Sequence, residues 1–289
     1  MNKLTIPPHD DVTSIYVAAQ NKKLSSYPHI QSILPSILTC YQQYDRAGGR
    51  SSKVTKIALN PKLREQLRKH YEKPPTCFKH IESMRDLSSH KVCPMCGSTH
   101  SGTLDHFLPK EDYPQYAVYS KNLVPACSCN SRRGRLLTGE SAEERLLHPY
   151  FDDCLTRRLL IAKFEQLGAI PKTSLTINCD KRDPLYPAIN FHAQSIVLKS
   201  SILKHISDTW SKLYRRPGEV VRNLNKNHLD PRTVKQILLE ELDYLDAFYE
   251  SKNNWRSVFV AGLLDEEVLN WITQRLSAPG RKPDSPLGP

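Results

Sequence analysis

Apolar residues recur at the spacing of an amphipathic helix in the two outer parts of the chain, residues 1–85 and 151–277. The pattern is clearest over Pro231–Lys252, where one helical stripe holds Val234, Leu238, Leu242, Leu245 and Tyr249. Asp230 is suited to cap this helix, and Pro231 is suited to its first turn. We therefore expect a long helix here, with the apolar stripe in the core.

Other stretches with the same period predict further helices. These cover Pro61–Tyr71, Asp153–Leu167, Ala188–Tyr214 and Asp265–Leu276. Thr and Ile residues favour a strand over Thr173–Cys179. Residues 278–289 are rich in Pro and Gly, and we expect them to form a disordered tail.

Residues 86–150 break this pattern. Gly, Pro, Cys, Asn and aromatic residues are dense there, and the helical period is lost. The sequence therefore predicts a mainly α-helical protein in which a compact module, residues 86–150, is inserted between the helical regions 1–85 and 151–277.

The chain of 289 residues is basic, since 41 Lys and Arg residues against 30 Asp and Glu give a net charge of +11. This charge suits a polyanionic partner such as nucleic acid. Eight of the basic residues lie between Arg50 and Lys73, where they form either a solvated face or a surface that follows phosphates. No apolar run is long enough to span a membrane, and the first residues lack the apolar core of a signal peptide. We therefore expect a cytoplasmic protein without a membrane partner.

Four of the eight cysteines are concentrated in the module. Cys93 and Cys96 form a C-x-x-C pair, and Cys127 and Cys129 form a C-x-C pair further along. Two such pairs can complete a tetrahedral structural zinc site, and the alternative is a set of reduced thiols without metal. The other four are scattered and are expected to be free thiols: Cys40, Cys77, Cys154 and Cys179.

Between the cysteine pairs lies the sequence Leu-Asp-His-Phe-Leu-Pro, which contains Asp105 and His106. Asn122 follows in Asn-Leu-Val-Pro, and Asn130 comes directly after Cys129. This arrangement resembles the HNH endonuclease motif in its zinc-stapled form, a small ββα-metal finger. The family usually has C-x-x-C at the second pair, so Cys127 is the less secure zinc ligand, and His100 is the alternative.

The resemblance implies hydrolysis of phosphodiester bonds. We expect His106 to be the general base, because an imidazole can accept a proton near neutral pH. Asp105 and Asn130 are expected to hold a catalytic Mg²⁺ or Mn²⁺, which prefers oxygen ligands. Because consecutive residues of a strand point to opposite sides, Asp105 can face the metal while His106 faces the attacking water. By the same resemblance, Asn122 organises the loop and orients the base.

Neighbouring side chains are weaker candidates. Arg132 and Arg133 follow Asn130 at the start of the expected finger helix, and Lys121 precedes Asn122, so all three are predicted either to contact substrate phosphate or to be solvated. Packing over the finger is favoured over stacking on bases for the three tyrosines of the segment, Tyr113, Tyr116 and Tyr119. His148 is a candidate supporting residue.

The wider pattern of LDHFLPK, NLVPACSCNSRRG and LLHPYFD is similar to the PtuB-like nucleases of bacterial anti-phage systems such as Septu and some retrons. This resemblance implies a nuclease effector that acts on nucleic acid together with an ATPase partner in the bacterial cytoplasm. DNA is favoured over RNA as the substrate. Two alternatives stay open: a self-contained restriction or homing-type DNA endonuclease, and a non-catalytic zinc module that binds nucleic acid or a partner.

Overall fold

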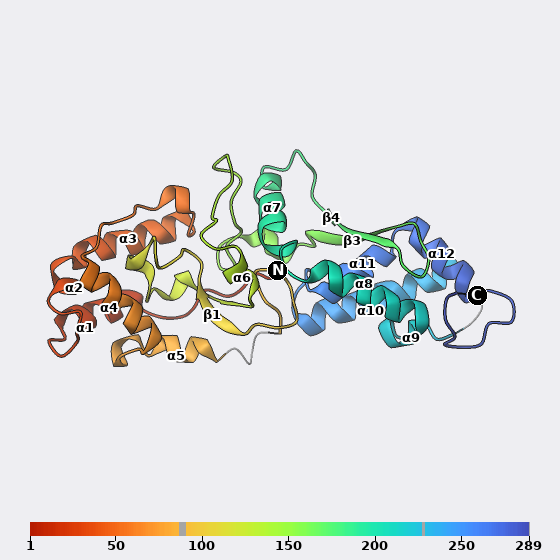
Figure 1. Cartoon of the computed structure of the whole chain (residues 1–289), viewed down its shortest axis with the longest axis horizontal. Coiled ribbons are helices and arrows are strands. Elements are labelled where there is room, and N and C mark those ends of the chain that lie inside the picture. The colour runs from red at the N-terminus through yellow and green to blue at the C-terminus, as the bar shows by residue number, and fades with distance from the viewer. Residues whose placement is uncertain (87–90, 227–228, 289) are drawn as a thin grey trace.

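The computed structural model describes residues 1–86, 91–226 and 229–288. About half of these residues are helical, and two small antiparallel sheets complete the fold. The molecule is elongated, with the N-terminal helices at one end and the C-terminal helices at the other (Figure 1). The N-terminal helices are α1 (Asp11–Gln20), α2 (His29–Ser32), α3 (Leu34–Ala47), α4 (Pro61–Glu72) and α5 (His80–Arg85), with 3-10 turns η1 (Ser51–Lys53) and η2 (Thr76–Phe78) between them.

The middle of the molecule holds the first sheet. Strand β1 (Thr103–His106) pairs antiparallel with β2 (Leu123–Ala126), with His106 opposite Leu123 and Thr103 opposite Ala126. The long connection between them contains the 3-10 turns η3 (Pro114–Tyr116) and η4 (Ser120–Asn122). A single helical turn, α6 (Cys129–Arg132), follows β2. The order strand, strand, helix is the one expected for this segment.

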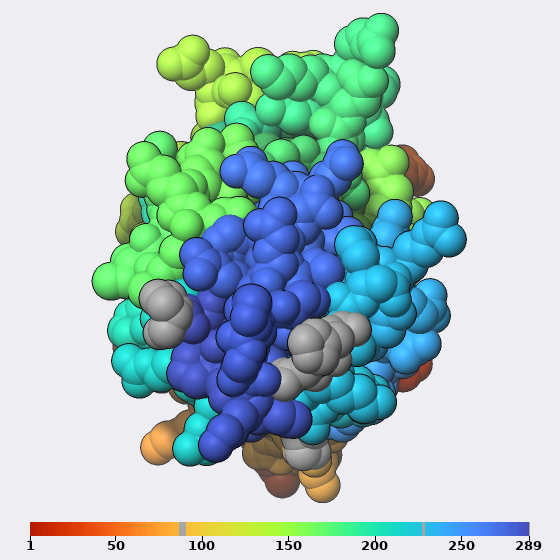
Figure 2. All heavy atoms as spheres, turned by 90° about the vertical axis from the view of Figure 1, so that its right-hand side faces the viewer, coloured from red at the N-terminus to blue at the C-terminus, as the bar shows by residue number. Residues whose placement is uncertain are grey.

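The C-terminal region begins with a 3-10 turn η5 (Asp153–Thr156) and a hairpin of β3 (Leu160–Glu165) and β4 (Lys172–Ile177). The helical segments that follow are α7 (Tyr186–His192), the π-helical turn η6 (Ala193–Val197), α8 (Ile202–Arg215), α9 (Pro217–Val220), α10 (Pro231–Tyr249), α11 (Trp255–Leu263) and α12 (Glu266–Leu276). Helix α11 packs against β3, and α8 packs against β4. In the end view, α12 and the tail after it lie at the centre, with α8 and α10 beside them (Figure 2). Among the described residues, no helix is both long and apolar enough to cross a bilayer.

Several expected elements are confirmed. Helix α10 begins at Pro231, and the Asp230 carboxylate accepts hydrogen bonds from the N–H groups of Arg232 and Thr233. Its predicted stripe is buried except at Tyr249. Helix α4, helix α12 and strand β4 also lie where the pattern placed them.

Three expectations are wrong. The helix predicted over Asp153–Leu167 is η5 and β3, and the burial of β3 alternates with the period of a strand. The long helix predicted over Ala188–Tyr214 is divided into α7, η6 and α8. The tail predicted to be disordered packs on the C-terminal region, because Leu287 is buried and its N–H donates to the Tyr214 carbonyl at 2.7 Å.

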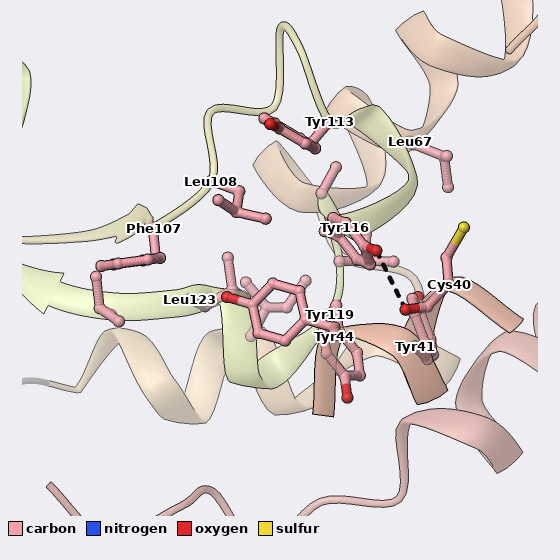
Figure 3. Packing of buried hydrophobic residues seen from close by; sticks show 14 of the residues in the cluster. Cys40, Tyr41, Tyr44, Leu67, Phe107, Leu108, Tyr113, Tyr116, Tyr119 and Leu123 are labelled. Atoms are coloured by element: carbon pink, nitrogen blue, oxygen red, sulfur yellow. Dashed lines mark hydrogen bonds between the residues drawn. The ribbon is translucent and has the colours of Figure 1, made fainter. Parts of the chain in front are cut away.

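The buried apolar side chains form two cores. The C-terminal core draws on residues after 146 together with Met1. The other core combines the N-terminal helices with the segment from Cys93 to Tyr150, so the helical region 1–85 and the module share one interior. Tyr41 of α3 stacks on Tyr119 at 4.1 Å between ring centroids, and the Tyr116 hydroxyl donates to the Cys40 carbonyl at 3.1 Å (Figure 3). Packing is therefore the structural role of these tyrosines.

A glycine in α11 marks the closest approach between this helix and the hairpin. A Cβ on Gly262 would collide with the backbone of Ala162 in β3. We predict that Gly262→Ala lowers the free energy of unfolding, because the collision with rigid backbone outweighs the ~1 kcal/mol that alanine gains over glycine inside a helix. Urea unfolding measures this. Gly168→Ala is the matched control, since its Cβ meets no atom within 4 Å. An equally stable Gly262→Ala protein would contradict the packing described.

Candidate functional site

The four cysteines of the module converge. Their sulfur atoms all lie within 4.8 Å of one another, with 3.6 Å between Cys93 and Cys129 and 3.5 Å between Cys96 and Cys127. Tetrahedral zinc with Zn–S bonds of about 2.3 Å requires sulfurs roughly 3.8 Å apart. The cluster can therefore hold a metal such as zinc. His100 is exposed and is not part of this group of ligand atoms.

Local backbone geometry and the C-terminal region together hold the first cysteine pair. Gly97 adopts a φ of 83°, which closes the turn after Cys96, and its N–H donates to the Cys93 carbonyl at 2.8 Å. Trp255 of α11 donates its indole N–H to the Cys96 carbonyl at 2.8 Å and its backbone N–H to the Gly97 carbonyl at 3.0 Å. The cysteine turn is thus tied to the C-terminal region.

Asp105 and His106 stand at the end of β1. The imidazole of His106 is buried, and its Nε2 lies 2.9 Å from the Ala117 carbonyl oxygen. Because a carbonyl can only accept, Nε2 carries the proton and Nδ1 of the neutral ring keeps a lone pair. Nδ1 lies 4.0 Å from the half-exposed Asp105 carboxylate. Burial, strengthened by the nearby Lys110, lowers the pKa of His106 to about 4.

Asn130 lies against this pair. Its Nδ2 donates to Asp105 Oδ2 at 2.6 Å and to the His106 carbonyl at 3.3 Å. Its Oδ1 accepts from Arg133 Nε at 2.6 Å. The structure therefore brings together Asp105, His106 and Asn130, but the amide oxygen that was expected beside Asp105 faces Arg133 instead.

Arg133 is not a surface contact for phosphate, which corrects the expectation from sequence. Its side chain is buried, and its guanidinium donates to the carbonyls of His106, Phe107 and Leu136 in addition to Asn130. Burial lowers the pKa of Arg133 to about 10, so it stays cationic at neutral pH. Its hydrogen bonds tie Asn130 to the backbone that follows His106.

The other two basic candidates lie at the surface. Arg132 is exposed and donates to the Lys199 carbonyl at 3.2 Å. Lys121 pairs with Asp45 at 2.6 Å, so this ammonium already has an acidic partner. Among the two, Arg132 has the side chain that is more open to a substrate.

Asn122 is fully buried, and its side chain makes four hydrogen bonds with other described residues. Its Nδ2 donates to the Leu108 and Tyr116 carbonyls at 3.1 and 3.2 Å, and its Oδ1 accepts from the Leu108 N–H at 2.8 Å. The Tyr44 hydroxyl supplies the fourth bond at 3.0 Å. This network fixes the loop that leads from His106 to β2, as expected of an organising residue.

His148 supports the same network from the other side. The Tyr150 N–H donates to its Nδ1, so Nε2 carries the proton and donates to the Tyr44 hydroxyl at 3.0 Å. Burial lowers the pKa of His148 to about 3, which keeps the ring neutral. Sequence reasoning singled out His148 but missed Tyr44.

The sequence analysis did not identify Tyr71 of α4 either. Its ring lies 4.3 Å from the His106 ring, and its hydroxyl donates to the Leu104 carbonyl in β1. Lys110 and Arg85 place their charges 5.0 and 4.9 Å from the centre of the Tyr71 ring. Two cations therefore stand beside the tyrosine that contacts the buried histidine.

Two known proteins are similar to parts of this chain. Protein ea31 of Escherichia phage lambda is 34% identical over 102 residues, which are 34% of this chain and 33% of ea31. Septu protein PtuB of Bacillus thuringiensis is 40% identical over 50 residues, which are 17% of this chain and 18% of PtuB. The similarity thus spans a third or less of either relative. No family model matches the sequence, and no solved structure does.

We predict that Cys96→Ser releases the metal and unfolds the β1–α6 segment, because a structural zinc site supplies folding free energy on the order of 10 kcal/mol. Metal analysis and circular dichroism of the purified protein measure both effects. Cys77→Ser is the control, since Cys77 lies outside the cluster and should keep both metal and fold. A folded, metal-free Cys96→Ser protein with wild-type stability would refute the assignment.

Tyr44→Phe should lower the free energy of unfolding by about 1–3 kcal/mol, because it leaves Asn122 Oδ1 and His148 Nε2 with one partner fewer in a buried place. Urea unfolding gives the value. Tyr41→Phe serves as the control from the same aromatic cluster, since no hydrogen bond of its hydroxyl is found among the described residues. Equal stability of the two variants would show that the hydrogen bonds of Tyr44 to Asn122 and His148 do not stabilise the fold.

Proposed function

We propose that this chain is a metal-dependent endonuclease of the HNH type, which hydrolyses phosphodiester bonds in nucleic acid. The observation that carries the proposal is the meeting of Asp105, His106 and Asn130 beside a four-cysteine cluster. A zinc module that only binds has no use for a buried imidazole with a free lone pair next to a carboxylate. The 50 residues that resemble part of Septu protein PtuB support a role in anti-phage defence.

His106 is the general base in this proposal. The Ala117 carbonyl holds Nε2–H, so Nδ1 can take a proton from water without any change of tautomer. The ring is buried and packed against Tyr71, which fixes its direction. The proton would move to Nδ1 on the side of Asp105, where the adjacent carboxylate stabilises the imidazolium that forms.

Asp105 and Asn130 are the residues that would hold a cation. The carboxylate fits this role because it is half-exposed and one oxygen, Oδ2, is bonded to the Asn130 amide rather than to a fixed cation. Asn130 would fit with its amide turned over, so that the oxygen takes the place of the nitrogen at 2.6 Å from Asp105. Arg133 Nε, which now donates to that oxygen at 2.6 Å, would then have to move away from the amide nitrogen, because both groups are donors. Mg²⁺ or Mn²⁺, when bound, supplies charge neutralisation at the phosphate and its leaving oxygen.

Substrate phosphate would approach from the side of Lys110 and Arg85. Both cations lie beside Tyr71, which contacts the catalytic imidazole. In this proposal Lys110 and Arg85 take the phosphate-binding role that the sequence analysis gave to Arg133. Arg132 remains a candidate for the same role. Contacts of this kind position the backbone and carry no base information, so they suit DNA and RNA alike.

We further propose that the chain is the nuclease effector of a bacterial defence system and works with an ATPase partner. The similarity to part of PtuB supports this role over that of a self-contained restriction or homing-type enzyme. Most of the chain lies outside the β1–α6 segment, so it offers surface for a partner.

His106→Ala should reduce cleavage by 10²–10⁴-fold, the usual share of a general base, while the protein keeps its zinc and its fold. The free energy of unfolding falls, because the variant leaves a cavity and an unpaired Ala117 carbonyl. Cleavage of plasmid DNA and of RNA is measured in Mg²⁺ and in Mn²⁺, with the protein purified alone and with the products of its neighbouring genes. Phage plating on cells that carry the same genes gives a second readout. His100→Ala is the control, since His100 is exposed and outside the site.

The outcomes separate the alternatives. Activity that requires an ATPase neighbour supports the defence effector, and cutting at defined sites by the chain alone supports a self-contained enzyme. If His106→Ala cleaves and protects as well as wild type, the hydrolytic proposal fails and the non-catalytic module replaces it.

A further inference from the structure

A second group of potential metal ligands lies outside the site described above. It consists of His9 before α1, Asp11 at the first position of α1 and His80 at the first position of α5. One ligand atom from each residue lies within 4.8 Å of the other two. Sequence reasoning did not identify this group, because His80 lies about seventy positions after His9 and Asp11 and the three follow no known ligand spacing.

His80 has a lone pair that nothing in the described structure satisfies. Its Nε2 lies 3.2 Å from the Val118 carbonyl, so Nε2 carries the proton and Nδ1 is an acceptor. Nδ1 is buried and has no hydrogen-bond partner. A buried acceptor without a partner costs free energy and indicates a missing water or ion. An imidazole that donates one nitrogen to a carbonyl and offers the other is the usual state of a metal-bound histidine.

Asp11 and His9 are each held in place by a serine. Both Asp11 oxygens accept from Ser120, one from its N–H at 2.9 Å and one from its hydroxyl at 2.6 Å, and each keeps a further lone pair. His9 Nε2 lies 2.8 Å from the Ser14 hydroxyl.

We propose that His9, Asp11 and His80 bind a divalent transition-metal ion of the zinc class, with water completing the coordination. Two imidazoles and one carboxylate are ligands typical of Zn²⁺ and its neighbours, whereas Mg²⁺ and Ca²⁺ prefer oxygen alone. The His9 and His80 rings are stacked with 3.7 Å between centroids. They must turn edge-on to share an ion, so binding replaces this stacking.

The position of the group defines what an ion would do there. Val118 contacts His80, and Ser120 contacts Asp11. Both lie in the chain between Ala117, whose carbonyl accepts from His106, and Asn122. An ion on the three ligands would therefore join the start of α1 and the start of α5 to the loop that orients His106. The site is structural and does not depend on whether the chain hydrolyses nucleic acid.

Native mass spectrometry of the full chain after dialysis against Zn²⁺ tests the proposal by counting bound ions. Wild type and the control His100→Ala should each hold one ion more than His80→Ala and His9→Gln. Co²⁺ substitution provides the check on folding, because the charge-transfer absorption of sulfur-bound cobalt reports the four-cysteine site and should be equal in all four proteins.

The added ion should also raise the unfolding temperature of wild type in the presence of Zn²⁺ above that of His80→Ala and His9→Gln. Equal ion counts in all four proteins would overturn the proposal. If His80→Ala loses the cobalt–sulfur absorption as well, His9→Gln decides, because His9 packs at the edge of the group and its removal leaves the Val118 contact intact. Loss of nuclease activity alone has no bearing on this result.

Discussion

Four cysteine sulfurs within 4.8 Å of one another can share one metal ion at the base of the segment that carries the candidate site. Strands β1 and β2 have four residues each, and α6 is a single turn. A two-stranded sheet of this size is marginal by itself in water. A zinc ion on the sulfurs would link the turn before β1 to the start of α6. That link sets where Asn130 lies relative to Asp105 and His106.

The N-terminal helices also hold the loop between β1 and β2 in position. The loop between β1 and β2 is buried against α3, where Tyr44 meets Asn122, and against the start of α1, where Asp11 meets Ser120. This loop supplies the Ala117 carbonyl that assigns the proton of His106 to Nε2. The chemistry available to the imidazole is therefore decided by packing between the module and the N-terminal helices, and the module is no independent unit in this respect.

The sequence revealed the features that are local in the chain. The cysteine pairs, the Asp-His dyad and the capped helix α10 follow from spacing over a few residues. Tyr44 could not be found, because it lies 78 positions before its partner Asn122, and a backbone carbonyl such as that of Ala117 has no signature at all. Arg133 was misassigned because its place after Asn130 suggested phosphate, whereas folding buries it under the site. The β3 segment was misread because a short apolar run fits either period.

X-ray absorption at the zinc edge tests the central claim most directly, namely that the two cysteine pairs share one zinc ion. It is best recorded on His80→Ala, so that the four-cysteine cluster alone is loaded. The account predicts four sulfur atoms at about 2.3 Å. A shell of three sulfurs and one nitrogen would indicate that His100 replaces Cys127 as a zinc ligand. A protein without zinc would contradict the claim that a metal ion stabilises the segment carrying the candidate site.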